Sequence, residues 1–372
     1  MPEPVRKKSS YMPTLDGWRA IAILAVIFHH DAIHALGAVN TRWVWEYGNT
    51  GVDVFFAISG ILICSRLLDE EKIFGRIHLK SFYIRRAFRI LPPALVYLGV
   101  IAILAAIGLI VESPGGLLSA VFFCRNYPHL LGSALGDPGY FTTHFWSLSL
   151  EEQFYFFLPA LLVFTPRQIR IPVLGVLAAV VFLNRIFVLH THRWEFTQAH
   201  TDVRIDSLLV PAIFAVLVSN PRWKPYFQRA LRFWPVFVLA ILYILPFGID
   251  TAWRASAIVW IMPCIVMGSV LNSQNIFGSI LEFAPLKYIG RISYSLYLWQ
   301  QLFFVEHFDP TGHTLGWVQS WPMRLALTFA CAIASYHLLE KPVTRIGHKL
   351  APSATPGRDE PHTPSKTSSP AA

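Results

Sequence analysis

Long apolar runs alternate along this chain with short segments that hold most of its arginine and lysine residues. Each run is close to the roughly 20 residues that a helix needs to cross a bilayer. The pattern therefore predicts an all-α fold, a polytopic transmembrane helical bundle. We expect spans near residues 16–35, 50–68, 91–111, 144–164, 171–190, 203–219, 233–249, 254–271, 285–305 and 322–340.

One further apolar run, at 116–131, decides between ten and eleven spans. It is short and contains Arg125 and Asn126, which favours a re-entrant or interfacial segment. With this run outside the count and the N-terminus inside, most of the 31 lysines and arginines lie on the inner side. The positive-inside rule thus favours about ten spans with both termini cytoplasmic. Eleven spans remain an alternative, because charge counts tolerate an exception.

Composition supports a membrane environment. Of the 372 residues, 54% are hydrophobic and 14% are charged, whereas soluble domains contain about 25% charged residues. The net charge of +9 falls in clusters between apolar runs, so we expect contact with lipid and no nucleic acid. The four cysteines are scattered without a metal-binding spacing, and we expect no metal. We divide the chain into a cytoplasmic segment (1–10), a membrane domain (11–345) and a disordered cytoplasmic tail (346–372).

The first predicted span contains two polar residues on one helical face. Arg19 and His30 are eleven positions apart, which places them about 20° apart around a helix and about 16 Å apart along it. His29 points about 80° away from Arg19. Charged groups inside a span are costly and suggest function. A hydrogen bond from the histidine to a neighbouring helix is the alternative; the shared face favours a site at His30, with His34 one turn further out.

Basic residues gather before the third predicted span, at Arg85, Arg86 and Arg89. Arg86 and Arg89 share a helical face. A positive-inside anchor would explain them, and phosphate recognition by guanidinium groups is the functional alternative.

Four acidic residues are supporting or acceptor-side candidates, each with a local alternative. Asp53 could orient His30 or pair with an arginine, or simply cap the second helix. Glu152 could hydrogen-bond an acceptor hydroxyl, or lie in a first helical turn. Asp206 is expected to pair with the nearby Arg204, and Glu340 to form a salt bridge at the inner interface.

Six stretches, in order along nearly the whole chain, resemble the acyltransferase 3 family of integral-membrane acyltransferases. They are 15–22 (LDGWRAIA) continuing to His30, 51–60 (GVDVFFAISG), 82–92 (FYIRRAFRILP), 145–155 (FWSLSLEEQFY), 289–299 (IGRISYSLYLW) and 335–342 (SYHLLEKP). Trp18 departs from the small or aliphatic residue that the family places before its first-helix arginine. Many members also have an SGNH-hydrolase-like domain, which we expect to be missing from this standalone membrane unit.

The resemblance implies a bacterial inner-membrane enzyme that moves an acyl group, often acetyl, from cytoplasmic acyl-CoA to a hydroxyl. The acceptor would be a cell-surface glycan, glycolipid or related molecule, and downstream glycan-assembly proteins could be partners. It implies acyl-CoA as co-substrate, with no bound cofactor. Arg19 and His30 match the family's first-helix arginine–histidine pattern, and Arg86 and Arg89 match its Arg-x-x-Arg pair. Our hypothesis is that the three arginines bind acyl-CoA and that His30 is catalytic, as a general base or a covalent acyl carrier.

Two rival functions remain open. A transporter could use the buried arginine, histidine and aspartate residues as a substrate or proton path. A membrane di-iron oxidase is suggested by His30 and His34 together with His190, His192 and His200, but these are few and loosely spaced for such a site.

Overall fold

The computed structural model describes residues 11–35, 42–127, 139–191, 198–244, 251–304 and 315–352. Every regular element within these ranges is helical, which confirms the all-α class. The longer helices are α1 (Pro13–Ala35), α2 (Arg42–Phe74), α3 (Leu79–Ala106), α6 (Phe145–Phe164), α7 (Arg170–His190), α10 (Asp206–Ser219), α12 (Trp234–Ile244), α13 (Thr251–Leu271), α16 (Ser293–Phe303), α17 (Met323–Ser335) and α18 (Lys341–Leu350). The shorter ones are α4 (Pro114–Val121), α9 (Thr201–Arg204), α11 (Lys224–Ala230), α14 (Ile276–Leu281) and α15 (Ala284–Arg291).

Helix α2 lies at the centre of the bundle, packed against α1, α6, α10 and α13. Glycines allow the closest approaches. A Cβ atom on Gly51 would lie 2.5 Å from the Ala22 carbonyl oxygen of α1, and one on Gly60 would lie 2.4 Å from the Leu208 carbonyl oxygen of α10. Small residues serve this purpose in membrane helices, where close backbone packing replaces the hydrophobic effect.

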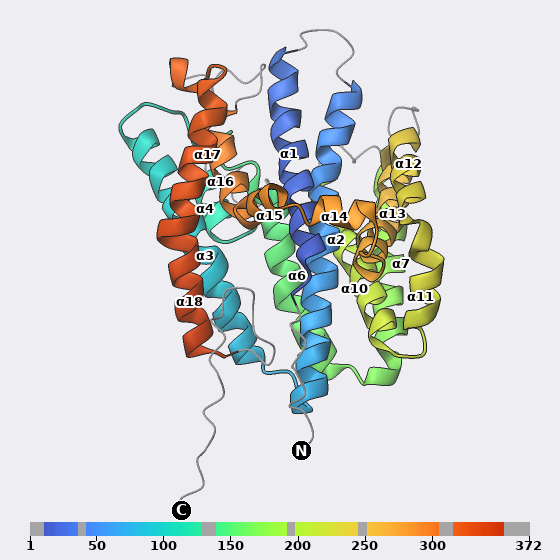
Figure 1. The fold of residues 1–372 in the computed structure, drawn as a ribbon. Helices are drawn as coiled ribbons and strands as arrows, with labels where there is room; N and C mark the ends of the chain where they lie inside the picture. Colours follow the sequence, from blue (N-terminus) through green and yellow to red (C-terminus); the bar gives the residue numbers. More distant parts are fainter. Residues whose placement is uncertain are drawn as a thin grey trace, which may run out of the picture.

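The other helices flank this central pair. Figure 1 shows α3, α4, α16, α17 and α18 on one side of α1 and α2, and α7 and α10 to α13 on the other. The short helices α14 and α15 run crosswise to the long ones and pack against α1.

The outer faces of the bundle are apolar. On α7, Val176, Val180, Leu183 and Phe187 follow helical spacing on one face, and each is more than half exposed. Such a stripe suits contact with lipid. Among the residues that the structure describes, four helical segments are long and apolar enough to cross a membrane by length and composition: Thr50–Phe74, Leu79–Ala106, Arg167–His190 and Trp253–Leu271. The count of ten spans and the cytoplasmic placement of both termini stay predictions.

The structure moves several predicted boundaries. Within 116–131 the helical part is α4, which has 8 residues and is therefore about 12 Å long, too short to cross a bilayer; residues 128–131 lie outside the described ranges. The predicted span 285–305 is broken at Ile292, between α15 and α16. Helix α18 reaches Leu350, so the first five residues of the predicted disordered tail, 346–350, are helical.

Candidate functional site

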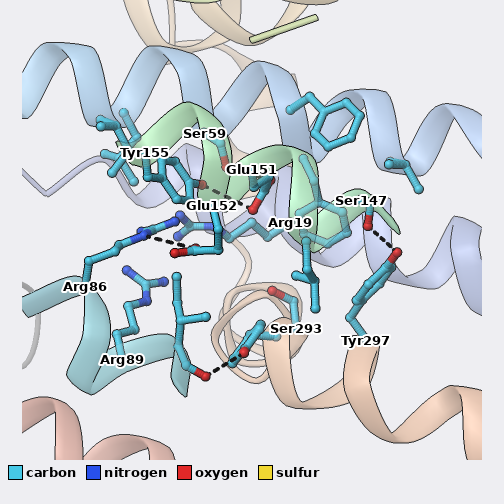
Figure 2. A pocket seen from close by; sticks show the side chains of 18 residues that line it. Arg19, Ser59, Arg86, Arg89, Ser147, Glu151, Glu152, Tyr155, Ser293 and Tyr297 are labelled. Carbon is cyan, nitrogen blue, oxygen red and sulfur yellow. Dashed lines mark hydrogen bonds and ion pairs between the residues drawn. The ribbon is translucent and has the colours of Figure 1, made fainter. Parts of the chain in front are cut away.

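A pocket lies between α1, α2, α3, α6 and α16, and Figure 2 shows its lining. Arg19 of α1, Arg86 and Arg89 of α3, and Glu152 of α6 all face it. Four of the predicted site residues, taken from three distant parts of the sequence, thus meet at one place. The other lining residues are Val52, Phe55, Phe56, Ser59, Leu62, Ile63, Ile90, Ser147, Leu148, Glu151, Tyr155, Ser293, Tyr294 and Tyr297.

Arginines dominate the charge on this pocket. Besides the three on its wall, Arg66 of α2 lies in the electrostatic field of Arg89, Arg19, Arg86 and Arg85. Its Nε atom is buried without a hydrogen-bond partner. Five guanidinium groups from α1, α2 and α3 thus form one group, which we call the arginine cluster.

Carboxylates neutralise only part of the arginine cluster. Three of its members have a carboxylate partner: Arg19 pairs with Asp16 at 3.3 Å, Arg85 with Glu70 at 3.3 Å and Arg86 with Glu152 at 3.8 Å. Among the described residues, Arg66 and Arg89 have no ion pair. Like charges held together inside a protein destabilise it unless an anion compensates them. The two arginines without an ion pair are therefore suited to an anionic ligand.

The carboxylates of α6 have separate partners on the pocket wall. Glu151 accepts hydrogen bonds from Ser59 Oγ at 2.9 Å and from Tyr155 Oη at 3.2 Å. The Arg86 guanidinium carbon lies 3.5 Å from the centre of the Tyr155 ring, and its ion pair with Glu152 is long. The Tyr155 ring thus holds Arg86 in place by a cation–π contact, leaving guanidinium N–H groups available to a ligand.

His30 lies beyond the pocket rather than on its wall. The Gln300 side chain of α16 and the ring of His144 are its polar neighbours from other helices. His29 is 4% exposed and packs on Gly48 of α2, where an added Cβ would lie 2.0 Å from the His29 Cβ. The preference for His30 over His29 stays a prediction. The side chain of His34 lies outside the described residues.

Two pocket residues connect the pocket wall to His144. Tyr297 and Ser147 share a hydrogen bond of 2.5 Å between their hydroxyl groups, and both line the pocket. Tyr297 also donates to the His144 carbonyl oxygen at 3.0 Å, and the two rings lie 5.5 Å apart. His144, which belongs to the environment of His30, thus adjoins the pocket wall.

The sequence was compared with known protein families and proteins. A family model described as an acyltransferase domain matches residues 12–339. The chain belongs to the acyltransferase 3 family.

The curated relatives of this acyltransferase include two proteins of Staphylococcus aureus. One, from strain MSSA476, is named "Putative O-acetyltransferase" and is 30% identical over 92% of this chain. The other, from strain NCTC 8325, is named O-acetyltransferase OatA and is 28% identical over 91% of this chain. The chain spans 59% and 58% of the length of these relatives. No solved structure matches the chain.

The remaining predicted residues of the acyltransferase lie away from the pocket. Asp53 is inside α2 rather than at its start, so the helix-cap interpretation was wrong; it pairs with Arg204 at 2.8 Å. The expected local ion pair between Arg204 and Asp206 was also wrong, since Asp206 pairs with the buried Arg185. These pairs join α2, α7, α9 and α10. Glu340 is buried and accepts a hydrogen bond from Ser295 at 2.9 Å, which ties α16 to the π-helical turn Tyr336–Glu340 between α17 and α18.

Five residues of this region were not singled out as candidates from the sequence: Arg66, Glu151, Tyr155, His144 and Gln300. Three of them had a signal. Arg66 falls inside the predicted span 50–68, where a charge is costly, and Glu151 and Tyr155 are spaced for contact on one helix. His144 and Gln300 had none, because only the fold brings α16 and the residue before α6 close to His30 of α1.

Proposed function

We propose that this acyltransferase takes an acyl group, acetyl in the simplest case, from acyl-CoA on the cytoplasmic side of the inner membrane. It passes the group to a hydroxyl of a cell-surface glycan, glycolipid or related acceptor on the outer side. Membership of the acyltransferase 3 family and relatives named as O-acetyltransferases support O-acyl transfer.

The arginine cluster is the observation that supports an acyl-CoA donor. Coenzyme A has a diphosphate and a 3′-phosphate at one end and the thioester at the other. Guanidinium groups bind phosphate oxygens in bidentate fashion. In this proposal Arg66, Arg86 and Arg89 take the phosphates, and Arg19 directs the pantetheine arm along α1 toward the outer half.

The thioester would then lie past Ser147 and Tyr297, beside His30. As a general base, His30 accepts the proton of the acceptor hydroxyl while that oxygen attacks the thioester carbon. The carbon–sulfur bond breaks, and the CoA thiolate takes the proton from the imidazolium. As a covalent carrier, the His30 nitrogen attacks the thioester carbon, and the CoA thiolate leaves with the proton of the ring N–H. The acceptor oxygen then displaces the imidazole, which takes the proton of the acceptor hydroxyl. Both routes yield the same ester and free CoA thiol.

The acceptor binds from outside in either route. Glu152 is assigned to the donor side, because its ion pair with Arg86 places it at the arginine cluster. Asp53, Asp206 and Glu340 hold helices together through Arg204, Arg185 and Ser295. An enzyme that esterifies a surface glycan would work with glycan-assembly proteins that use its product.

The proposal is tested by following the labelled acetyl group of acetyl-CoA with purified protein and a polysaccharide or glycolipid acceptor. We expect wild type to release CoA thiol and to form an alkali-labile acetyl ester, and His30→Ala to lose at least a hundredfold in rate. His190→Ala, at the exposed outer end of α7, is the matched control and should keep full activity. A protein that leaves acetyl-CoA intact, as a transporter would, contradicts the proposal.

A further inference from the structure

His144 is a buried histidine for which neither the fold nor the proposed chemistry has yet provided a role. It immediately precedes α6 and is 5% exposed. Its ring lies among three aromatic rings, with centroids 5.4 Å from Tyr97, 4.9 Å from Phe145 and 5.5 Å from Tyr297. Neither Nδ1 nor Nε2 has a hydrogen-bond partner in the described part of the chain.

Both unpaired nitrogens are costly in this position. A neutral imidazole has one N–H donor and one acceptor, and burying either without a partner destabilises the fold. A phenylalanine or leucine would fill the same aromatic surroundings without this cost. Buried polar groups left unpaired in a folded protein often serve binding or catalysis.

The backbone beside His144 is held firmly. Tyr97 Oη donates to the Phe141 carbonyl oxygen at 2.8 Å, and Tyr297 Oη donates to the His144 carbonyl oxygen at 3.0 Å. The Ser147 hydroxyl closes the same turn by contact with the His144 carbonyl oxygen at 3.2 Å. These contacts hold the backbone of His144, and the three aromatic rings pack around its imidazole.

That place is between the pocket and the first-helix histidine. One neighbour of the ring, Tyr297, lines the pocket that holds the arginine cluster. Another neighbour is His30 itself, whose field reaches the His144 ring. Gln300 also approaches His30, and its Oε1 atom is buried without a partner. Unpaired polar atoms of His144 and Gln300 therefore lie near His30, where the proposed transfer takes place.

We infer that His144 is a catalytic residue that stabilises the oxyanion of acyl transfer; this inference rests on the proposed function. Its ring N–H donates to the thioester carbonyl oxygen. When the attacking atom bonds to the carbonyl carbon, the π electrons move to that oxygen, and the N–H holds the resulting oxyanion. Collapse restores the C=O bond and expels the CoA thiolate, which receives the proton held by His30. His144 itself neither gains nor loses a proton.

A neutral imidazole suits this role. Pre-positioned donors aimed at a developing oxyanion act most strongly where water is excluded, and neutral histidine is known as such an electrophile. A donor with no acceptor in the free protein needs no rearrangement before it meets the carbonyl oxygen. Burial among Tyr97, Phe145 and Tyr297 also keeps the ring away from water, which would compete for its N–H.

The test compares three variants with wild type in the acetyl-CoA transfer assay. His144→Phe keeps a ring of similar shape without a donor, and His144→Gln keeps an N–H donor. We expect His144→Phe to lower kcat about a hundredfold or more with little change in the KM for acetyl-CoA, and His144→Gln to recover at least tenfold of that loss. His190→Phe, on the exposed end of α7, should behave as wild type.

The outcomes separate this inference from the proposed function. If wild type transfers no acetyl group, the proposed function fails. If wild type is active and His144→Phe is equally active, only the role of His144 is overturned. The role is also overturned if His144→Gln is as slow as His144→Phe, which would indicate that His144 transfers a proton. A lower melting temperature in either variant, with the kcat of the folded fraction unchanged, would overturn it as well.

Discussion

Replacing Arg66 by methionine tests whether the arginine cluster exists to bind an anion. Methionine keeps an unbranched side chain of similar reach and removes the charge. Arg66 has no carboxylate partner among the described residues, and four other arginines contribute to its field. In the absence of ligand, Arg66→Met therefore removes like-charge repulsion and a buried unpaired Nε–H. We expect the free variant to melt at a higher temperature than wild type.

The same change should weaken binding of acyl-CoA. A hydrogen bond to a charged group contributes about 1.5–3 kcal/mol, so one lost guanidinium–phosphate contact weakens binding about tenfold to 150-fold. At a CoA concentration of 100 times the wild-type Kd, binding stabilises wild type by about 2.7 kcal/mol. For a variant whose Kd is ten to a hundred times weaker, the gain at that concentration falls to about 1.4 or 0.4 kcal/mol.

Thermal unfolding in detergent, with and without acetyl-CoA, measures both effects in one assay. Arg229→Met, on the exposed face of α11, is the matched control and should leave the ligand-induced shift unchanged. Dephospho-CoA, which lacks the 3′-phosphate, should stabilise wild type less than CoA does. An Arg66→Met protein with an unchanged acetyl-CoA shift, or one that melts below wild type without ligand, would refute this account of the cluster.

Three further changes test other parts of the structure. Glu152→Gln removes an anion 3.8 Å from Arg86, so CoA should bind several-fold tighter in calorimetry; weaker binding would contradict the donor-side assignment. Asp206→Ala leaves Arg185, 1% exposed, without its carboxylate partner and should lower the free energy of unfolding by about 3–5 kcal/mol. In denaturant titrations, adding Arg185→Met to the same chain should restore much of that stability. Equal instability of the double variant would contradict the ion-pair explanation. Burial raises the pKa of Glu112, between α3 and α4, to about 7. The contribution of Glu112 to stability is therefore complete below about pH 4.5 and is lost as pH rises through 7. Glu112→Gln should flatten the fall in melting temperature between pH 5 and 8, and an unchanged slope would exclude Glu112 as the source of that fall.

Hydropathy was sufficient for helices that are apolar along their whole length. The predicted spans 144–164, 171–190 and 254–271 match α6, α7 and α13 to within a few residues. It was insufficient where tertiary contacts decide the helix ends. Helix α3 starts at Leu79, twelve residues before the predicted span, so Arg85, Arg86 and Arg89 lie inside the helix rather than ahead of it. Phe82 is buried against the core, and this packing extends the helix into the basic segment.

The candidate site, like the helix boundaries, could be predicted from the sequence only in part. Helical phase was enough to place Arg86 and Arg89 together, and both line the pocket with Arg19; the pairing of Arg19 with His30 stays a prediction. Ion-pair partners between helices were beyond the sequence: Asp53 pairs with Arg204, 151 positions away, and Arg185 with Asp206 rather than with a nearer neighbour. The same limit concealed His144 and Gln300, since nothing local places either of them next to His30.

The arrangement also accounts for the direction of the proposed acyl transfer, from the cytoplasmic side of the membrane to the outer side. Arg19 faces the pocket with the arginine cluster, and His30 lies eleven residues further along α1, with Ser147, Tyr297 and His144 between. A donor held by its phosphates at one end would thus present its thioester at the other, about half a bilayer away. In this proposal only the acyl group needs to cross the membrane.

Sidedness in proteoliposomes tests this account most directly. Acetyl-CoA labelled in the acetyl group is sealed inside vesicles that hold the protein with its cytoplasmic side inward, and the acceptor is added outside. The account predicts labelled ester on the external acceptor, CoA thiol retained inside, and loss of both with His30→Ala. Ester formation only when acetyl-CoA and acceptor share the same side of the membrane would contradict it.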